Sequence, residues 1–229
     1  PPEALGVRTK RIVDLVAQAI TQIDPDADAD ELALGILNKA GLKITSREDG
    51  TGALFFMSRA QAEALAHLAL ADEPPTAAQA KKALEQAPGV DIVLFGRMVA
   101  SDPSLNTDAC AQVAHSLSTH KVTNEFDYFT AVDDMSPEDT AGAGHIGTVE
   151  FNSATLYRYA TLAVHELHQL LPEGSPDAAA AFVDAFVRSM PTGKQNTFAN
   201  RTLPDAVLVC LRRDQPVNMV GAFERPVRA

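Results

Sequence analysis

The chain has 229 residues, of which 46% are hydrophobic, and its formal net charge is −11 at pH 7. This length and apolar content suffice for one sizeable core, in one elaborated domain or in two small ones. The two cysteines are too few for a disulfide framework, which favours a reducing cytoplasm. No apolar run approaches the roughly 20 residues of a membrane span, so we expect no membrane partner.

The acidic net charge argues against nucleic-acid binding at first sight, but the charge is unevenly distributed. Residues 1–89 carry nine basic and thirteen acidic side chains, whereas residues 186–229 carry seven basic and three acidic ones. The C-terminal part is therefore locally basic. An acidic segment on another copy of the chain is a suitable partner for it.

Helical patterns dominate the chain before Gly89. Apolar residues recur at helical spacing over Ile12–Ile23 and again over Leu32–Leu37, with a stop near Gly41. A short strand is expected over Leu54–Met57. Ser58 and Thr76 are expected N-caps of two further helices, over Arg59–Ala71 and from Thr76 to Gln86.

Strand patterns dominate after Gly89. The predicted strands are Val90–Val99, Cys110–Val122, Glu150–Thr161 and Ala206–Arg213. A helix over Asp177–Met190 separates the last two strands, and another helix is expected to begin near Leu162. We therefore expect an α+β protein with a helical region at residues 1–89 and a largely β region at residues 90–229.

One long connection stands out between two of these strands. The segment from Val122 to Glu150 holds seven carboxylates and no Lys or Arg. The strand before it has small and polar residues on both faces over Val113–Thr119. Unless an internal sheet buries these faces, they suit a ligand that approaches the backbone closely. Connections of this length are usually functional or unstructured. We expect this one to protrude and to contact a partner.

Three short motifs resemble catalytic or cofactor-binding signatures without their context. Gly142–Gly147 matches the dinucleotide fingerprint but lacks the strand before it and the helix after it. In His165-Glu166-Leu167-His168 the histidines are three apart rather than four, unlike a zincin. Gly193-Lys194-Gln195 lacks the Ser or Thr of a P-loop, although Lys194 remains a good phosphate contact. These motifs predict no cofactor and no metal.

An enzymatic alternative stays open in the acidic connection. Asp133 and Asp134 are adjacent carboxylates, and such pairs can hold a metal ion or act as acid and base. Together with His120 they allow a metal-dependent, nuclease-like enzyme. Solvation of these carboxylates, or contact with a basic partner, is the simpler interpretation.

A set of motifs from Gly89 to the C-terminus resembles a known family. In chain order they are Phe95-Gly96-Arg97-Met98, Gln112–Val122 (QVAHSLSTHKV), Phe126–Asp134 (FDYFTAVDD), Gly144–Ser153 (GHIGTVEFNS), Leu156–Ala160 (LYRYA) and Gly193-Lys194-Gln195. Their combination and order are similar to the CasC-type backbone subunit of Cascade, the type I-E CRISPR surveillance complex. The helical first third resembles the family in position and type only.

The resemblance implies a hand-shaped protein. An RRM-like (ferredoxin-like) palm would carry an inserted helical fingers region at about residues 1–89 and a long β-hairpin thumb at about 122–152. Copies would bind head to tail along CRISPR RNA as a filament, next to other Cascade subunits. Each thumb would displace one base, so that target DNA pairs with the guide in interrupted segments. The subunit would be non-catalytic.

The resemblance also implies roles for single residues. Met98 and Ile146 match the apolar side chains beside the displaced base, whereas Tyr128, Phe129 and Thr130 match an element at the base of the thumb, near the RNA. The other expected RNA-binding residues are polar: Arg97, Arg158, Lys194 and Gln195.

Alternatives remain for several of these residues. Met98 is also explained as a core residue, Tyr128 and Phe129 as apolar anchors of the loop, and Lys194 as a solvated lysine. Arg97 would either approach a phosphate or pair with a thumb carboxylate of the neighbouring copy. The family places a first palm strand and a Lys- and Arg-rich segment before the fingers, and neither is visible in this sequence. The principal phosphate-binding lysines therefore stay unassigned.

Overall fold

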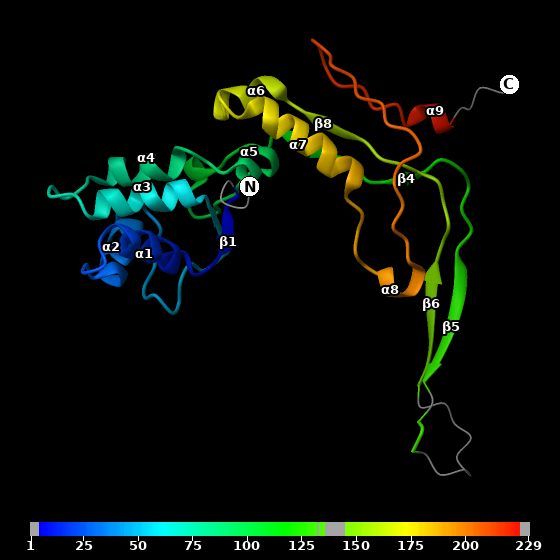
Figure 1. The fold of residues 1–229 in the computed structure, drawn as a ribbon, viewed down its shortest axis with the longest axis horizontal. Coiled ribbons are helices and arrows are strands. Elements are labelled where there is room, and N and C mark those ends of the chain that lie inside the picture. The colour runs from blue at the N-terminus through cyan, green and yellow to red at the C-terminus, as the bar shows by residue number, and fades with distance from the viewer. Residues whose placement is uncertain (1–4, 132, 136–144, 225–229) are drawn as a thin grey trace. The chain divides into compact units, whose positions relative to one another are not determined.

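The structure is a computed structural model that describes residues 5–131, 133–135 and 145–224. The chain divides into two compact units, which are described separately (Figure 1). The first comprises the described parts of Pro1–Gln112 and Thr161–Cys210, and the second those of Val113–Ala160 and Leu211–Ala229. Helices and small antiparallel sheets occur together, which confirms the expected α+β class.

A helical core forms the N-terminal part of the first unit. Helices α1 (Ile12–Ile23), α2 (Ala29–Lys39), α3 (Arg59–Ala69) and α4 (Ala77–Glu85) pack together beside the antiparallel pair β1 (Val7–Thr9) and β2 (Phe55–Met57). The apolar stripe of α1 is buried completely at Ile12, Val16 and Ile20, because helical spacing puts these residues on one face. All buried members of this core cluster lie between Ile12 and Leu105.

The predicted N-caps, Ser58 and Thr76, lie at the starts of helices α3 and α4. The Ser58 hydroxyl accepts from Gln61 N at 3.0 Å while Gln61 Oε1 accepts from Ser58 N at 3.0 Å, and Thr76 and Gln79 form the same reciprocal box at α4. Each box supplies acceptors for amide groups that a helix start otherwise leaves unpaired. The predicted helices of the first ninety residues and the strand predicted over Leu54–Met57 are confirmed, with ends that differ by no more than three residues.

The strand predicted over Val90–Val99 is wrong at its start. Residues Val90–Phe95 form helix α5, not a strand. Their apolar run has no alternation and suits a buried helix as well as a buried strand. Helix α5 buries Ile92 and Val93, and Asp91 Oδ1 accepts from Gly6 N at 2.9 Å, so tertiary contacts favour the helix.

The two longer helices that come after strand β8 agree with the prediction. Helix α6 (Val164–Leu170) begins near Leu162 as expected, and α7 (Ser175–Arg188) agrees within two residues at each end with the helix predicted over Asp177–Met190. The short helix α8 (Gln195–Phe198) follows. In α6 the histidines of the zincin-like motif lie on an amphipathic helix, with Leu167 buried and the His165 side chain 78% exposed.

No strand forms over Ala206–Arg213, against the prediction. This segment lies exposed and carries large apolar side chains, with Leu208 73% and Leu211 91% exposed. Its β-forming sequence has no neighbouring strand among the described residues, and an unpaired strand is not stable on its own.

The second unit is built on pairs of antiparallel strands. Strand β5 (Glu125–Ala131) pairs with β6 (His145–Phe151) in full register, and β4 (Leu117–Ser118) pairs with β7 (Leu156–Tyr157). Strand β3 (Ala111–Val113) pairs with β8 (Ala160–Leu162), and most residues of both strands belong to the first unit. Each sheet therefore has two strands, and the predicted long strands Cys110–Val122 and Glu150–Thr161 are each divided into short pieces.

The register of the β3–β8 pair differs by one residue from the register of the β4–β7 pair. Ala114 N donates to Tyr159 O at 2.9 Å, whereas Leu117 lies opposite Tyr157. Three steps on one strand therefore face two steps on the other, which is the arithmetic of a β-bulge. The bulge explains why the strand predicted over Cys110–Val122 is interrupted. The described C-terminal segment of this unit includes α9 (Gly221–Glu224), where the ring of Phe223 packs against Tyr157 at a centroid distance of 5.2 Å.

Candidate nucleic-acid interface

The hairpin of β5 and β6 presents two chemically different faces. Residues that lie directly opposite each other in an antiparallel pair share a face, and neighbours along a strand alternate. Tyr128 lies opposite Thr148, and Thr130 lies opposite Ile146. Tyr128, Thr130 and Ile146 therefore share one face, which we call the Tyr128 face. Phe126 and Glu150, which lie opposite each other, belong to it as well.

The side chains of the Tyr128 face are open to solvent. Tyr128 is 75% exposed, Ile146 66% and Phe126 59%. A large exposed apolar surface of this kind is typical of a binding site. Aromatic rings on a strand also offer flat surfaces on which unpaired bases stack.

Phe129 lies on the opposite face of the hairpin and has a local partner. It lies opposite Gly147, where an added Cβ would fall 2.7 Å from Phe129 Cε1. Glycine therefore allows the ring to lie flat against β6, and the ring of His145 packs beside it at 5.7 Å. Phe129 is 43% exposed, clearly less than Tyr128. The structure thus separates Phe129 from Tyr128 and Thr130, which the sequence alone placed in one element.

Electrostatics also distinguish the two faces. The Phe129 face carries Glu125 and Asp127 on β5, whereas the Tyr128 face carries one carboxylate, Glu150, which accepts from Asn124 Nδ2 at 3.5 Å. Carboxylates repel phosphate groups, and the repulsion falls off with distance and salt. The Tyr128 face is accordingly the better surface for a polyanion.

Arg97 lies inside the first unit and is only 6% exposed. Its guanidinium donates to three backbone carbonyls from separate segments: Leu105 O at 2.9 Å, Leu84 O at 3.0 Å and Phe56 O at 3.2 Å. It also donates to Gln61 Oε1 at 3.3 Å and lies over the ring of Phe55. Desolvation by burial lowers the pKa of Arg97.

This position gives Arg97 a structural role. Its donors tie α4, β2 and the segment around Leu105 together, so neither a phosphate nor a carboxylate of another copy reaches them in this arrangement. The sequence had predicted an RNA contact at Arg97. We leave Arg97 out of the interface for this physical reason.

Met98 follows Arg97 directly and points to solvent, with 82% of its surface exposed. Before the pair, Gly96 has a φ of 79° and would place an added Cβ 2.9 Å from Thr107 O. Only glycine fits such a conformation and such a close backbone approach without strain. The buried Arg97 and the glycine turn together fix the chain on which Met98 is displayed. A core position for Met98 does not agree with this exposure.

The remaining predicted contacts lie in other segments. Lys194 is exposed and has a φ of 60°, and Gln195 begins α8. Gln195 Oε1 accepts from Arg201, at 3.2 Å from Nε and 2.9 Å from Nη2. Arg158 is half-buried between β7 and β8. An RNA contact at Arg158, Lys194 or Gln195 remains a prediction, and Arg201 is a nearby cation that the sequence analysis did not single out.

The residues of the enzymatic alternative do not form a metal site in the described part of the chain. There, no group of three or more His, Cys, Asp or Glu side chains is arranged to hold a metal ion. His120 uses both ring nitrogens locally, with Nδ1 2.9 Å from Lys121 O and Nε2 3.2 Å from Thr155 N. Asp133 Oδ1 accepts from Met135 N at 3.0 Å. Gly142 and Gly144 of the fingerprint-like motif lie outside the described residues, and Gly147 lies in β6.

Comparison with known protein families shows to which family the chain belongs. The model of the CT1975-like protein family (Cas_CT1975) matches residues 1–229, the whole of the sequence. The chain belongs to this family. No curated protein matches it. In addition, none of the described helices is both long and apolar enough to cross a membrane.

Among the solved structures that are similar to this chain are two CRISPR RNA-guided surveillance complexes. A chain from a structure described as "CRISPR RNA-guided surveillance complex, pre-nicking" has 31% identity and a TM-score of 0.77, over 98% of this chain and 68% of that one. A chain from a "CRISPR RNA-guided surveillance complex" has 39% identity and a TM-score of 0.56, over 61% of this chain and 55% of that one. The resemblance to a Cascade backbone subunit is thereby confirmed.

Proposed function

We propose that this CT1975-like protein is a non-catalytic backbone subunit of a type I-E Cascade surveillance complex that binds CRISPR RNA. The observation that carries the proposal is the 31% identity over 98% of the chain to a subunit of a CRISPR RNA-guided complex. Guide pairing would supply the sequence specificity, since a protein of this kind needs only to hold the RNA backbone and leave bases free for target DNA. The pattern of cysteines supports a cytoplasmic location.

The hairpin of β5 and β6 is the proposed thumb. Its Tyr128 face combines an exposed aromatic ring with the exposed side chain of Ile146. An apolar side chain inserted between two bases offsets an unstacking cost of a few kcal/mol per step. Ile146 on the thumb and the exposed Met98 of the first unit are the two proposed wedges that displace a base.

The rest of the chain supports an RRM-like palm. After strand β8 come helices α6, α7 and α8 and then the exposed segment over Ala206–Arg213, which is not a strand in this structure. If this segment paired with neighbouring strands, the order would be strand–helix–strand, as at the end of a ferredoxin-like fold. The apolar side chains of this segment would be buried if neighbouring strands paired with it. The helices of residues 1–89 are the proposed fingers, and residues 90–229 would supply the palm and thumb.

The charge distribution supports assembly of several copies. The acidic segment between Val122 and Glu150 and the basic part after residue 186 are complementary in sign. A head-to-tail contact between two different surfaces generates a filament when it does not close into a ring. We propose that copies align in this way along the guide, next to other Cascade subunits.

Bound RNA in the purified protein is the decisive test. The full chain, expressed together with a CRISPR RNA, should purify with bound RNA. Ultraviolet absorbance of the purified protein would detect this RNA, and the length of the extracted RNA would show that the protein protects it. Added magnesium or manganese should leave labelled RNA and DNA intact, because the proposed subunit protects without cleaving. Protein free of RNA would refute the RNA-binding proposal. Metal-dependent cleavage that is lost on Asp133→Asn would instead support the nuclease-like alternative.

A further inference from the structure

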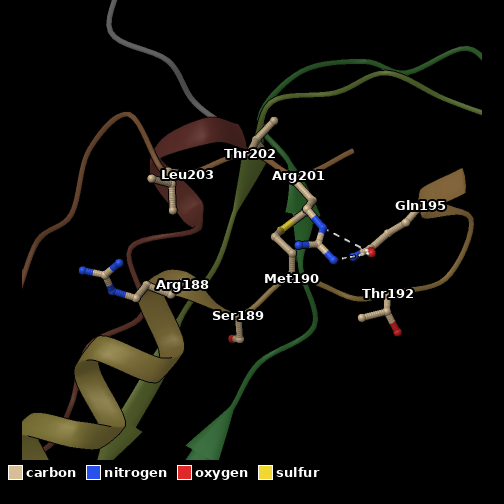
Figure 2. A pocket seen from close by; sticks show the side chains of 8 residues that line it. All are labelled: Arg188, Ser189, Met190, Thr192, Gln195, Arg201, Thr202 and Leu203. Atoms are coloured by element: carbon tan, nitrogen blue, oxygen red, sulfur yellow. Dashed lines mark hydrogen bonds between the residues drawn. The ribbon is translucent and has the colours of Figure 1, made fainter. Parts of the chain in front are cut away.

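A hollow in the first unit, lined by both polar and apolar side chains, contains a cation, Arg201, that the proposed function does not yet use. The hollow has a volume of about 460 Å³ and lies between the end of α7 and the segment after α8. Figure 2 shows the Arg201 and Gln195 side chains joined by hydrogen bonds at this hollow, with Met190 beside Arg201. A volume of this size is sufficient for a small polar group such as a nucleotide phosphate and its sugar.

The Arg201 guanidinium is held in place but not neutralised. Both of its hydrogen bonds go to the neutral amide oxygen Gln195 Oε1, at 2.9 and 3.2 Å. Among the described residues no carboxylate forms an ion pair with Arg201. A guanidinium has five N–H donors. Three therefore remain, including those on the end formed by Nη1 and Nη2, which is suited to a planar pair of phosphate oxygens.

Gln195 is itself fixed at the start of a strained turn. Its Nε2 is 3.4 Å from Pro191 O. Lys194 and Ala199, which flank α8 on its two sides, both have positive φ values, 60° and 48°. Such conformations are strained for residues other than glycine, and they cluster at functional sites. The turn thus holds the partner of Arg201 in one place.

The charge around the hollow favours an anion. No Asp or Glu occurs between Asp184 and Asp205, whereas Arg188, Lys194 and Arg201 lie in that segment. Arg188 is paired with Asp184 at 2.7 Å, which leaves Lys194 and Arg201 as the effective positive charges. Thr192 and Thr202 line the hollow and can add neutral donors.

We propose that Arg201, positioned by Gln195, binds a backbone phosphate of single-stranded RNA in this hollow. The inference rests on the proposed function for the identity of the polyanion. It changes the part assigned to Gln195, whose amide oxygen orients the arginine rather than contacting RNA. Arg201 becomes the principal phosphate ligand of this segment, with Lys194 beside it.

The test measures affinity of the full chain for a fluorescein-labelled oligouridine RNA across a series of salt concentrations. Each phosphate contact to a single strand contributes about 0.7 to the slope of log affinity against log salt. Arg201→Ala should lower the affinity and reduce this slope by about that amount. Gln195→Glu should do the same while preserving the hydrogen bonds, because a carboxylate in that place neutralises Arg201.

Two further variants separate positioning from charge. Gln195→Met removes the acceptor but keeps the positive charge, so it should weaken binding with an unchanged slope. Lys82→Ala removes one charge from the exposed surface of helix α4, far along the sequence, and should change neither quantity. Equal losses of slope in Lys82→Ala and Arg201→Ala would show a bulk charge effect and overturn the proposal.

The remaining outcomes are distinguishable. Wild-type protein that does not bind RNA at any salt concentration contradicts the proposed function itself. RNA binding by wild type that Arg201→Ala and Gln195→Glu leave unchanged overturns the phosphate site alone. If these two variants instead reduce self-association in sedimentation, the hollow binds a carboxylate of a second copy and the RNA assignment is wrong. Displacement of RNA by free uridine monophosphate at low concentration would show a nucleotide site rather than a backbone site.

Discussion

Replacement of Arg97 by methionine tests whether this arginine is a structural anchor. The change keeps an apolar side chain of similar length and removes four hydrogen bonds, three of them to backbone carbonyls. Leu84 O keeps a donor, since Gln61 Nε2 lies 2.6 Å away. The carbonyls of Leu105 and Phe56 lose the donor that Arg97 supplies.

The expected loss of stability follows from these two carbonyls. A buried acceptor that loses its donor costs about 1–3 kcal/mol. Removing the guanidinium also removes the cost of burying a charge, which the lowered pKa of Arg97 reflects. Together these effects predict that Arg97→Met lowers the free energy of unfolding by about 2–4 kcal/mol.

Urea unfolding followed by far-ultraviolet circular dichroism measures this change. Arg59→Met is the matched control, because Arg59 is exposed at the first position of α3. The control should change stability by no more than about 0.5 kcal/mol. Arg97→Met with a stability equal to that of Arg59→Met would refute the anchor. A folded Arg97→Met with a reduced salt slope of RNA binding would restore the phosphate contact that the sequence suggested.

Three further predictions concern a charge pair and the hairpin. The pKa of Asp102 is lowered from 3.8 to about 2, first by the hydrogen bond from Lys81 and then by Ser104. Its contribution to stability is therefore present above about pH 4 and is lost as the pH falls toward 2. Lys81→Met should raise this pKa in a carboxyl NMR titration, and an unchanged value would contradict the assigned cause. Ile146→Asp should weaken RNA binding without unfolding the protein; equal 2-aminopurine fluorescence at the displaced base in wild type and variant would exclude Ile146 as a wedge. Shortening Asn124–Gly147 to a tight turn should leave the helical core folded, since its buried members lie between Ile12 and Leu105, yet abolish ordered filaments in electron micrographs.

The sequence alone determined the elements that local chemistry specifies. The capping boxes at Ser58 and Thr76 and the helical spacing of Ile12–Ile23 depend on residues within a few positions of one another. Such signals do not depend on the rest of the fold. The motifs after Gly89 likewise sufficed to identify the family, because their order along the chain is itself the signal.

The tertiary structure decided everything that depends on contacts distant in sequence. Val90–Phe95 became a helix because it packs in the first unit, whereas Ala206–Arg213 has no neighbouring strand to pair with. The sequence suggested that Arg97 contacts RNA at the surface. In the fold, its guanidinium is buried and donates to three backbone carbonyls from distant segments. The strand register placed Tyr128 and Phe129 on opposite faces, and the turn at α8 brought Arg201 to Gln195. Burial, register and partner choice are properties of the folded chain, so no local pattern could have specified them.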